Sequence, residues 1–316
     1  MAIVKEQTER APAAVYTRQM QKPRLTFAVA IPVSNEAQNI VALLERAVTA
    51  KPQRILVVSD GSTDGTDHLV RSFAARSPVP VALETTASRR GKADAVNRLI
   101  AALRDVDVIA MISGDAMPAD GCIERLVAAF EDPTVGVAAG RPVPEGPAGV
   151  PAVEVSRLLW ALHHRIAMAC PKSTEITVFR NVIPGIDATS RTDEAAIEAA
   201  VMNQGYRIVY EPKAVIRTNC PLSLREYVKQ RTRVTLGHLV VARDGYGVGT
   251  LSWRQRFRAL GTLWREEGIK VSTMVRAVVL ETVIYCAAWL RLHISRPSHG
   301  VWSRVSSTKR PFGERG

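Results

Sequence analysis

The chain of 316 residues is 47% hydrophobic and 23% charged, a composition that excludes an intrinsically disordered chain and allows one large domain or two modest ones. Lys and Arg number 42 against 30 Asp and Glu, so the net charge of +12 predicts an anionic partner such as nucleic acid, a membrane surface or a phosphorylated substrate. The four cysteines are far apart and form no CxxC pair, which argues against a zinc or redox motif and favours reduced thiols in the cytosol.

The first half of the chain alternates between apolar strands and helical stretches. Residues 1–23 are polar and charged, and we expect them to form a flexible lead-in. Strands are predicted at residues 25–33, 54–60, 79–85, 107–113 and 134–140, and helices at residues 36–50, 64–76, 92–103 and 119–130. Alternation of this kind predicts an α/β fold with a mostly parallel central sheet that helices cover on both faces.

A stretch rich in Pro and Gly, residues 141–151, interrupts this alternation and is expected to be a linker or a loop that crosses the active face. Beyond it we predict a helix at residues 152–169, a strand at 175–180, a helix that opens at Thr192, a strand at 206–212 and a helix at about 223–241.

The C-terminal residues 253–316 are strongly basic, with 12 Lys and Arg against 4 Asp and Glu. Within them, residues 271–292 are apolar but are interrupted by Arg276 and Glu281. The apolar run between charges is shorter than the roughly 20 residues that a membrane span needs. The pattern therefore favours an amphipathic, interfacial helix on an anionic membrane surface, with a helix buried against the domain as the alternative.

Polar residues gather at four places where predicted strands end or helices begin. The four clusters are IPVSNEAQNI (31–40), VVSDGSTDGT (57–66), RRGKADAVN (89–97) and SGDAMP (113–118). Turn and helix-cap chemistry explains some of these residues. Because ligands of open α/β sheets bind beyond the carboxyl ends of the strands, the clusters also predict one shared ligand site.

These clusters, in this order, resemble the inverting family 2 glycosyltransferases with a GT-A fold. The resemblance continues through TDEAAIEAAVMNQGYRIVYEP (192–212) and KQRTRVTLGH (229–238), which is similar to the Gln-x-x-Arg-Trp motif of the branch that includes hyaluronan, poly-N-acetylglucosamine and cellulose synthases. It implies a nucleotide-sugar-binding domain at residues 24–250, divided into a donor half (24–140) and an acceptor half (141–250). Residues 251–316 would form the membrane-associating extension.

The activity implied by this resemblance is transfer of a sugar from a nucleoside diphosphate donor, most simply a UDP-sugar, to a hydroxyl of a glycan or lipid-linked acceptor. The enzyme would work at the cytoplasmic face of a membrane, in a peripheral or interfacial position. A catalytically degenerate homologue and a polyprenyl-phosphate glycosyltransferase remain alternatives.

The donor-site residues follow from the same resemblance. It implies that Pro32, Glu36 and Asp60 hold the nucleotide, with the two carboxylates reading the base, and that Lys92 lies near the diphosphate. Gly114 and Asp115 would complete the site, with Asp115 as ligand of a divalent ion, Mg²⁺ or Mn²⁺. Ser113 stands where the family has the first aspartate of its D-x-D motif. Asp64, by contrast, is interpreted as a cap of the following helix.

Catalysis and acceptor binding are assigned by the later motifs. An inverting transfer needs a general base for the acceptor hydroxyl, and the resemblance aligns Glu194 with that base and leaves Asp193 as the alternative. Gln230, Arg231 and Arg233 are expected to contact the diphosphate and the acceptor. Val234 replaces the tryptophan of the family motif and so removes an aromatic surface on which an acceptor sugar could stack. This replacement argues against a long polymer as the product.

Two other functional classes are weaker. A dinucleotide-dependent oxidoreductase needs a G-x-G-x-x-G turn after a strand, and the sequence has none. Nucleic acid is not the expected anionic partner, because aromatic residues make up only 5% of the chain and no basic patch is interleaved with them.

Overall fold

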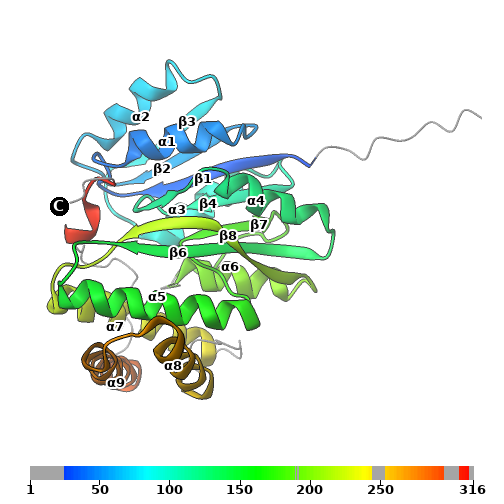
Figure 1. Ribbon diagram of the computed structural model, residues 1–316. Helices are drawn as coiled ribbons and strands as arrows, with labels where there is room; N and C mark the ends of the chain where they lie inside the picture. Colours follow the sequence, from blue (N-terminus) through cyan, green and yellow to red (C-terminus); the bar gives the residue numbers. More distant parts are fainter. Residues whose placement is uncertain (1–24, 189, 191, 244–252, 295–305, 313–316) are drawn as a thin grey trace, which may run out of the picture.

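The structure is a computed structural model that describes residues 25–188, 190, 192–243, 253–294 and 306–312. Its centre is an eight-stranded sheet in the order β3-β2-β1-β4-β7-β6-β8-β5, with helices packed on both faces (Figure 1). The predicted α/β architecture is therefore confirmed. The expected flexible lead-in and the expected start of the C-terminal extension at residue 251 lie outside the described residues.

The first half of the sheet is parallel and comes from the regular alternation in the sequence. Its strands are β1 (Phe27–Val33), β2 (Ile55–Asp60), β3 (Val81–Thr86) and β4 (Val108–Ile112), and the helices between them are α1 (Ile40–Thr49), α2 (Thr66–Ala74) and α3 (Lys92–Ala102). Successive side chains of a strand point to opposite faces. Val29 and Ile31 of β1 accordingly join the cluster that contains α1 and α2, whereas Ala28 and Ala30 join the cluster that contains α3.

The second half of the sheet is mixed. It contains β5 (Ala116–Pro118), β6 (Val135–Glu145), β7 (Ile176–Arg180) and β8 (Arg207–Asn219), with α4 (Cys122–Ala128) and the short helix η1 (Ala129–Glu131) before β6. Strand β7 is antiparallel to both β4 and β6, and β5 is antiparallel to β8, while β6 and β8 are parallel. The sheet is thus parallel in four of its seven strand pairs.

Residues 141–145 were expected in a linker or loop, and that prediction is wrong. They continue β6 and pair with β8 from Arg141 opposite Val215 to Glu145 opposite Asn219. Pro142 and Pro144 are two residues apart, so their missing N–H groups face one side, and the pairing of β6 with β7 has already stopped at Ala139. The sheet therefore loses no ladder hydrogen bond where these prolines stand.

A layer of helices lies beyond β6 and β8, at the bottom of Figure 1. It comprises α5 (Pro151–Ala169), α7 (Leu224–Arg243), α8 (Trp253–Glu267) and α9 (Val271–Ile294), while α6 (Asp193–Met202) packs on the sheet. Helices α8 and α9 pack on α5 through a separate apolar cluster that includes Val155, Leu158, Tyr227, Leu263 and Ile284. The sequence analysis did not predict α8.

Helix α9 is long and apolar enough to cross a membrane, by its length and composition alone, and only 17% of its most apolar window is buried. One side, which includes Ala277, Ile284 and Ala288, packs on the helical layer. Large apolar side chains on the other side are exposed: Val271, Val275, Val278, Val279, Val283, Trp289, Leu290 and Ile294. Helix α9 is therefore not a buried core helix.

Candidate functional site

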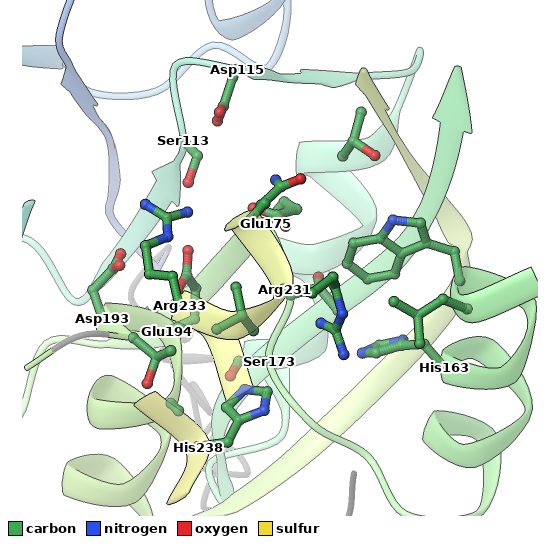
Figure 2. Close-up of a pocket in the computed structure, with 18 of the residues that line it drawn as sticks. Ser113, Asp115, His163, Ser173, Glu175, Asp193, Glu194, Arg231, Arg233 and His238 are labelled. Carbon is green, nitrogen blue, oxygen red and sulfur yellow. The ribbon is translucent and has the colours of Figure 1, made fainter. Parts of the chain in front are cut away.

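One cavity of about 810 Å³ lies at the carboxyl ends of β1, β2 and β4 and extends toward the helical layer. All eleven residues that the sequence analysis singled out for the site line it: Pro32, Glu36, Asp60, Lys92, Gly114, Asp115, Asp193, Glu194, Gln230, Arg231 and Arg233. Part of this wall is drawn in Figure 2, where Ser113 and Asp115 lie above the acids of α6. The predicted convergence of the strand-end clusters is thus present in the structure.

Glu36 lies in the turn after β1 and is almost fully buried, with 2% of its surface exposed. Burial raises the pKa of its carboxyl to about 7, and the nearby charge of Asp115 adds to the rise. The carboxyl forms an ion pair with the ammonium of Lys309, which opposes that shift. The other carboxyl oxygen, Oε2, has no hydrogen-bond partner within the described part of the chain. A buried acceptor of this kind is suited to a ligand N–H group.

Asp60 ends β2 and holds the backbone that leads into α3. Its Oδ1 accepts the N–H of Arg90 at 2.6 Å, and its Oδ2 accepts the N–H of Gly91 at 2.9 Å. These bonds fix the loop that presents Lys92 at the first position of α3. Asp60 therefore lines the cavity and also fixes the backbone beside it.

Asp64 contacts the first residue of the helix that it was expected to cap, but the N-cap position itself is occupied by Gly65. Its carboxylate accepts the N–H of Thr66, the first residue of α2, at 3.1 Å and the Thr66 hydroxyl at 2.5 Å. The other carboxylate oxygen accepts the N–H of Ala37 at 3.0 Å, so Asp64 also ties the turn after β1 to the turn after β2.

Lys92 connects the end of β4 to the acids of α6. Its Nζ lies 2.7 Å from Glu194 Oε1, 2.9 Å from Asp193 Oδ2 and 2.9 Å from the hydroxyl oxygen of Ser113. Burial disfavours the charged lysine, but Asp193 and Glu194 outweigh it and raise the pKa of Lys92. Ser113, which replaces an aspartate of the family motif, is thus an acceptor for this lysine.

The two acids of α6 titrate differently. Burial, followed by the charge of Glu194, raises the pKa of Asp193 to about 7. Burial alone would raise the pKa of Glu194, but the positive charge of the nearby Lys92 has the larger effect and lowers it. At neutral pH the pair therefore offers a permanent carboxylate at Glu194 beside an Asp193 that is close to its own pKa.

Glu175 is a site residue that sequence reasoning missed. It immediately precedes β7 and lines the cavity opposite the acids of α6. Burial, together with the charges of Glu194 and Asp115, raises its pKa to about 8. A polar residue at the start of a strand has no distinctive pattern, so only the assembled fold reveals this third acid.

Lys309 is the second residue that the sequence analysis missed. It lies in the C-terminal 3₁₀ turn η3 (Ser306–Lys309), which is red in Figure 1. Its ammonium pairs with Glu36 and lies 3.8 Å from Asp115 Oδ2. Burial disfavours the charge on Asp115, but Lys309, Lys92 and Arg233 outweigh it and lower the pKa of Asp115.

Gly114 is required for the close approach of two strand ends. A Cβ at this position would lie 2.9 Å from Glu36 Cγ and 2.9 Å from Val33 Cγ1. Such contacts are shorter than real Cβ atoms tolerate, so a larger residue would displace Glu36 from its position beside Asp115.

The three residues from α7 differ in their contacts. Arg231 forms a bidentate pair with Glu281 of α9, with Nε to Oε1 at 3.1 Å and Nη2 to Oε2 at 3.0 Å. Tyr227 donates its hydroxyl to the same carboxylate at 2.8 Å. Arg233 instead extends toward Ser113 and the acids of α6 (Figure 2). Gln230, the residue before Arg231, also lines the cavity.

The side chains of the site limit how a metal ion could be bound. Within the described residues, no group of three or more His, Cys, Asp or Glu is arranged to hold a metal ion. Asp115, whose side chain is 39% exposed, is placed to give one carboxylate. Mg²⁺ and similar ions are commonly held by one or two carboxylates together with phosphate oxygens and water. The site therefore fits an ion that binds with a diphosphate.

Residues 28–179 match the family model Glycosyl transferase family 2. The chain carries a glycosyl transferase family 2 domain. The family predicted from the strand-end motifs is therefore confirmed for this domain. The matched residues run from β1 to β7 and contain Glu36, Asp60, Lys92 and Asp115, whereas the acids of α6 and all of α7 follow the match.

The curated relatives of this chain include proteins named for polysaccharide synthesis. It is 25% identical over 226 residues to the poly-beta-1,6-N-acetyl-D-glucosamine synthase of Staphylococcus aureus (strain COL), which covers 66% of this chain and 54% of the synthase. It is 34% identical over 103 residues to the succinoglycan biosynthesis protein ExoA of Rhizobium meliloti (strain 1021), or 31% of each chain. The chain thus spans about half the length of the synthase.

A solved structure has the same fold over nearly the whole chain. The mannosyltransferase PcManGT from Pyrobaculum calidifontis, in complex with GDP-Man and Mn²⁺, aligns with a TM-score of 0.64 at 20% identity and covers 92% of each chain. The predicted GT-A type of fold is therefore confirmed, and the likeness includes the region that follows the family match.

Proposed function

We propose that this glycosyltransferase moves a sugar, with inversion, from a nucleoside diphosphate donor to a hydroxyl group of a glycan or lipid-linked acceptor. The observation that carries the proposal is the meeting of Lys92 with Glu194 in the cavity that Glu36, Asp60 and Asp115 also line. This arrangement supplies cations for a diphosphate on one side and a charged carboxylate for an acceptor hydroxyl on the other.

In the proposed donor site, the nucleoside lies between Glu36 and Asp60 beyond the ends of β1 and β2, next to Pro32. The unpartnered Glu36 Oε2 would accept the imide N–H of uracil, which favours a UDP-sugar. Lys92, at the N-terminus of α3, would face the diphosphate, because helix N-termini and ammonium groups both attract phosphate.

A divalent ion, Mg²⁺ or Mn²⁺, is part of this proposal. Asp115 would hold it together with the diphosphate. When bound, it would offset the negative charge that develops on the leaving group. Lys309 lies beside both Asp115 and Glu36, so its ammonium would have to share these carboxylates with the incoming ion.

Glu194 is the proposed general base and Asp193 its alternative. As the acceptor oxygen bonds to the anomeric carbon, its proton passes to Glu194, and the bond between that carbon and the diphosphate oxygen breaks with its electron pair remaining on the diphosphate. Attack from the face opposite the leaving group inverts the configuration. Gln230 and Arg233 line the route from the acids toward α7 and are the proposed acceptor or diphosphate contacts. Arg231 keeps such a role only if a ligand displaces Glu281.

A membrane location is also proposed, at the cytoplasmic face, with α9 lying in the interface. The support is the exposed apolar side of α9 together with the basic composition of the C-terminal region.

The test of the proposed function is a panel of UDP- and GDP-sugars, measured for binding by calorimetry and for nucleotide release. We expect UDP-sugars to bind and to be slowly hydrolysed. Glu194→Gln should keep UDP binding and lose transfer to acceptor by about 100-fold or more. Absence of binding by every nucleotide sugar would contradict the proposal.

A further inference from the structure

The cavity does not end at the acids of α6 but continues between α5, α7, α8 and α9. Beyond Glu194 its wall includes Arg231 and His163, which lie on the other side of the site in Figure 2. Part of the wall is aliphatic and comes from α5, α8 and α9; we term this part the apolar arm, and it consists of Leu158, Leu162, Leu260, Met274, Ala277 and Val278.

The side chains of the apolar arm are aliphatic, and Tyr227, which packs beside Leu158 and Ala277 and also lines the cavity, uses its hydroxyl on Glu281. A sugar chain is bound through hydrogen-bonding groups and aromatic faces, whereas Leu, Met, Ala and Val offer only dispersion contacts and exclusion of water. Burying a hydrocarbon chain against such a wall contributes about 0.8 kcal/mol for each buried methylene. The chemistry of the arm therefore suits an alkyl or isoprenoid chain.

The two charges that α7 and α9 bring near the arm neutralise each other. Arg231 and Glu281 are bidentate partners, and their side chains are 18% and 12% exposed. His163, at the same wall, has a pKa well below its ordinary value because it is buried and near cationic groups, so it is neutral at physiological pH. An uncharged chain can pass these groups without separating an unpaired charge from water.

The arm also reaches the exposed apolar side of α9. Val278 lines the cavity, and it lies four residues after Met274 of the arm and three residues after the exposed Val275. Residues three and four apart are neighbours on a helix surface. Val278 thus joins the inner wall of the arm to the outer surface that Val271, Val275 and Val279 share.

We propose that the acceptor is a single-headed amphiphile: its hydroxyl-bearing head lies at Glu194 and its hydrocarbon chain occupies the apolar arm. The chain enters past Val278, from the surface that α9 presents to a lipid layer. This inference rests on the proposed function for the identity of the reaction, and it selects the lipid-linked acceptor over the free glycan. It does not depend on which sugar is transferred.

The first experiment measures binding of methyl, n-octyl and n-dodecyl β-D-glucopyranoside to the full chain by calorimetry, below the micelle concentrations and without donor. The head is constant, so any trend reports the chain. We expect the affinity to rise at least tenfold from methyl to octyl, as buried methylenes require. An affinity that does not change with chain length overturns the proposal.

Variants then locate the chain. Ala277→Phe fills the arm and should lower the affinity for the octyl compound at least tenfold. Val278→Ser changes the half-exposed rim with little risk to folding and should lower it several-fold. The matched control is Val279→Phe, which adds the same ring on the outer side, outside the cavity lining, and should leave the affinity unchanged. Equal losses in Ala277→Phe and Val279→Phe would contradict the assignment.

Transfer assays separate this inference from the proposed function. With a donor selected from the nucleotide-sugar panel, alkyl glycosides should accelerate nucleotide release more than free oligosaccharides with the same sugars. If oligosaccharides are the better acceptors, the enzyme is a glycosyltransferase but the lipid inference is wrong. If no nucleotide sugar binds, the proposed function fails, while the chain-length series still decides whether the arm binds an amphiphile.

Discussion

The ammonium of Lys92 lies 2.7 Å from Glu194 Oε1 and thereby joins the first residue of α3 to the second residue of α6. The same ammonium lies 2.9 Å from Asp193. Of the two acids, Glu194 keeps a lowered pKa against the effect of burial, whereas burial and the charge of Glu194 raise the pKa of Asp193 to about 7. Lys92 thus contacts both acids, but at neutral pH Glu194 is charged whereas Asp193 is close to its own pKa.

This difference predicts the pH dependence of transfer. If Glu194 is the base, its pKa lies below its ordinary value of 4.5, and kcat at saturating donor should stay level from about pH 8 down to about pH 5.5 before it falls. If Asp193 is the base, the rate falls as the pH drops through about 7. We expect the first profile, measured by nucleotide release with saturating acceptor.

Substitutions check the same assignment. Asp193→Asn should retain most of the transfer activity and keep the level profile, because the charged base remains. A hundredfold loss in Asp193→Asn, with activity retained in Glu194→Gln, would assign the base to Asp193. Binding of UDP, measured by calorimetry, should persist in both variants and serves as the control for folding.

The C-terminal lysine predicts a pH-dependent stability effect. Lys309→Met leaves the buried Glu36 without its cation, so the Glu36 pKa should rise above its present value of about 7. A carboxyl whose pKa is raised by folding costs stability as the pH rises through that pKa. We therefore expect Lys309→Met to lose about 2 kcal/mol of unfolding free energy at pH 8.5 and clearly less at pH 5.

Urea denaturation of both proteins at the two pH values measures this difference. Lys213→Met, which removes an exposed lysine of β8, is the matched control and should change the unfolding free energy little at either pH. A loss for Lys309→Met that is equal at pH 5 and pH 8.5 would show that the ion pair with Glu36 is not its cause.

The donor half of the site could be predicted from the sequence because its signals are local. Strands β1 and β4 are uninterrupted apolar runs, and Glu36 and Asp115 stand shortly past their ends. Strand β2 begins with the apolar residues 55–58 and ends at Asp60. A parallel arrangement then brings those ends together without further information. The same reasoning failed at residues 141–145, because prolines that break most strands are tolerated where no neighbour requires their N–H groups.

The parts that the sequence did not predict depend on contacts between distant segments. Lys309 and Glu36 are 273 residues apart, and nothing local to the C-terminal turn indicates where it lies. Arg231 was predicted to contact the diphosphate and the acceptor because of the motif that contains it. Its partner Glu281 lies in the apolar stretch for which only membrane binding was predicted. Ion pairs of this kind are set by how helices pack, which the periodicity of either helix does not encode.

Replacing glycine by alanine should have opposite effects on stability at Gly114 and at Gly261. Gly114→Ala forces a Cβ to within 2.9 Å of Glu36 and Val33, so we expect a loss of about 1–3 kcal/mol in unfolding free energy and weaker binding of UDP. Gly261→Ala, in α8, adds a methyl group that meets nothing within 4 Å and should stabilise the helix by up to about 1 kcal/mol. Urea denaturation and UDP titration of both variants measure the contrast, and destabilisation by Gly261→Ala as well would contradict it.

The pair of Arg231 and Glu281 predicts a non-additive double variant. Arg231→Met alone should cost about 3–5 kcal/mol of unfolding free energy, because it leaves Glu281 buried without its cation. Adding Glu281→Leu should restore most of that loss. UDP affinity distinguishes a structural role from a ligand contact. Full UDP affinity in the restored double variant means that Arg231 holds α9 on α7, and a persistent tenfold loss means that it binds the diphosphate.

The exposed side of α9 predicts how the protein binds a lipid surface. Val275→Asp combined with Val279→Asp places two charges among side chains that are 57% and 56% exposed, so the fold should tolerate them while the apolar contact with lipid is lost. We expect co-sedimentation with phosphatidylserine vesicles to fall at least tenfold. Deleting residues 268–316 is a poorer test, because it also removes Glu281 and Lys309 from the site.

Two controls separate the apolar contact from simple repulsion. Val275→Ala combined with Val279→Ala adds no charge and should still weaken binding, because it removes apolar area from the same side of α9. Val182→Asp adds a negative charge at another exposed valine, outside the C-terminal helices, and should leave binding to neutral vesicles unchanged. If the alanine pair binds vesicles as well as the wild type and only added charge weakens binding, then the basic residues of the chain, and not the apolar side of α9, hold the protein at the membrane.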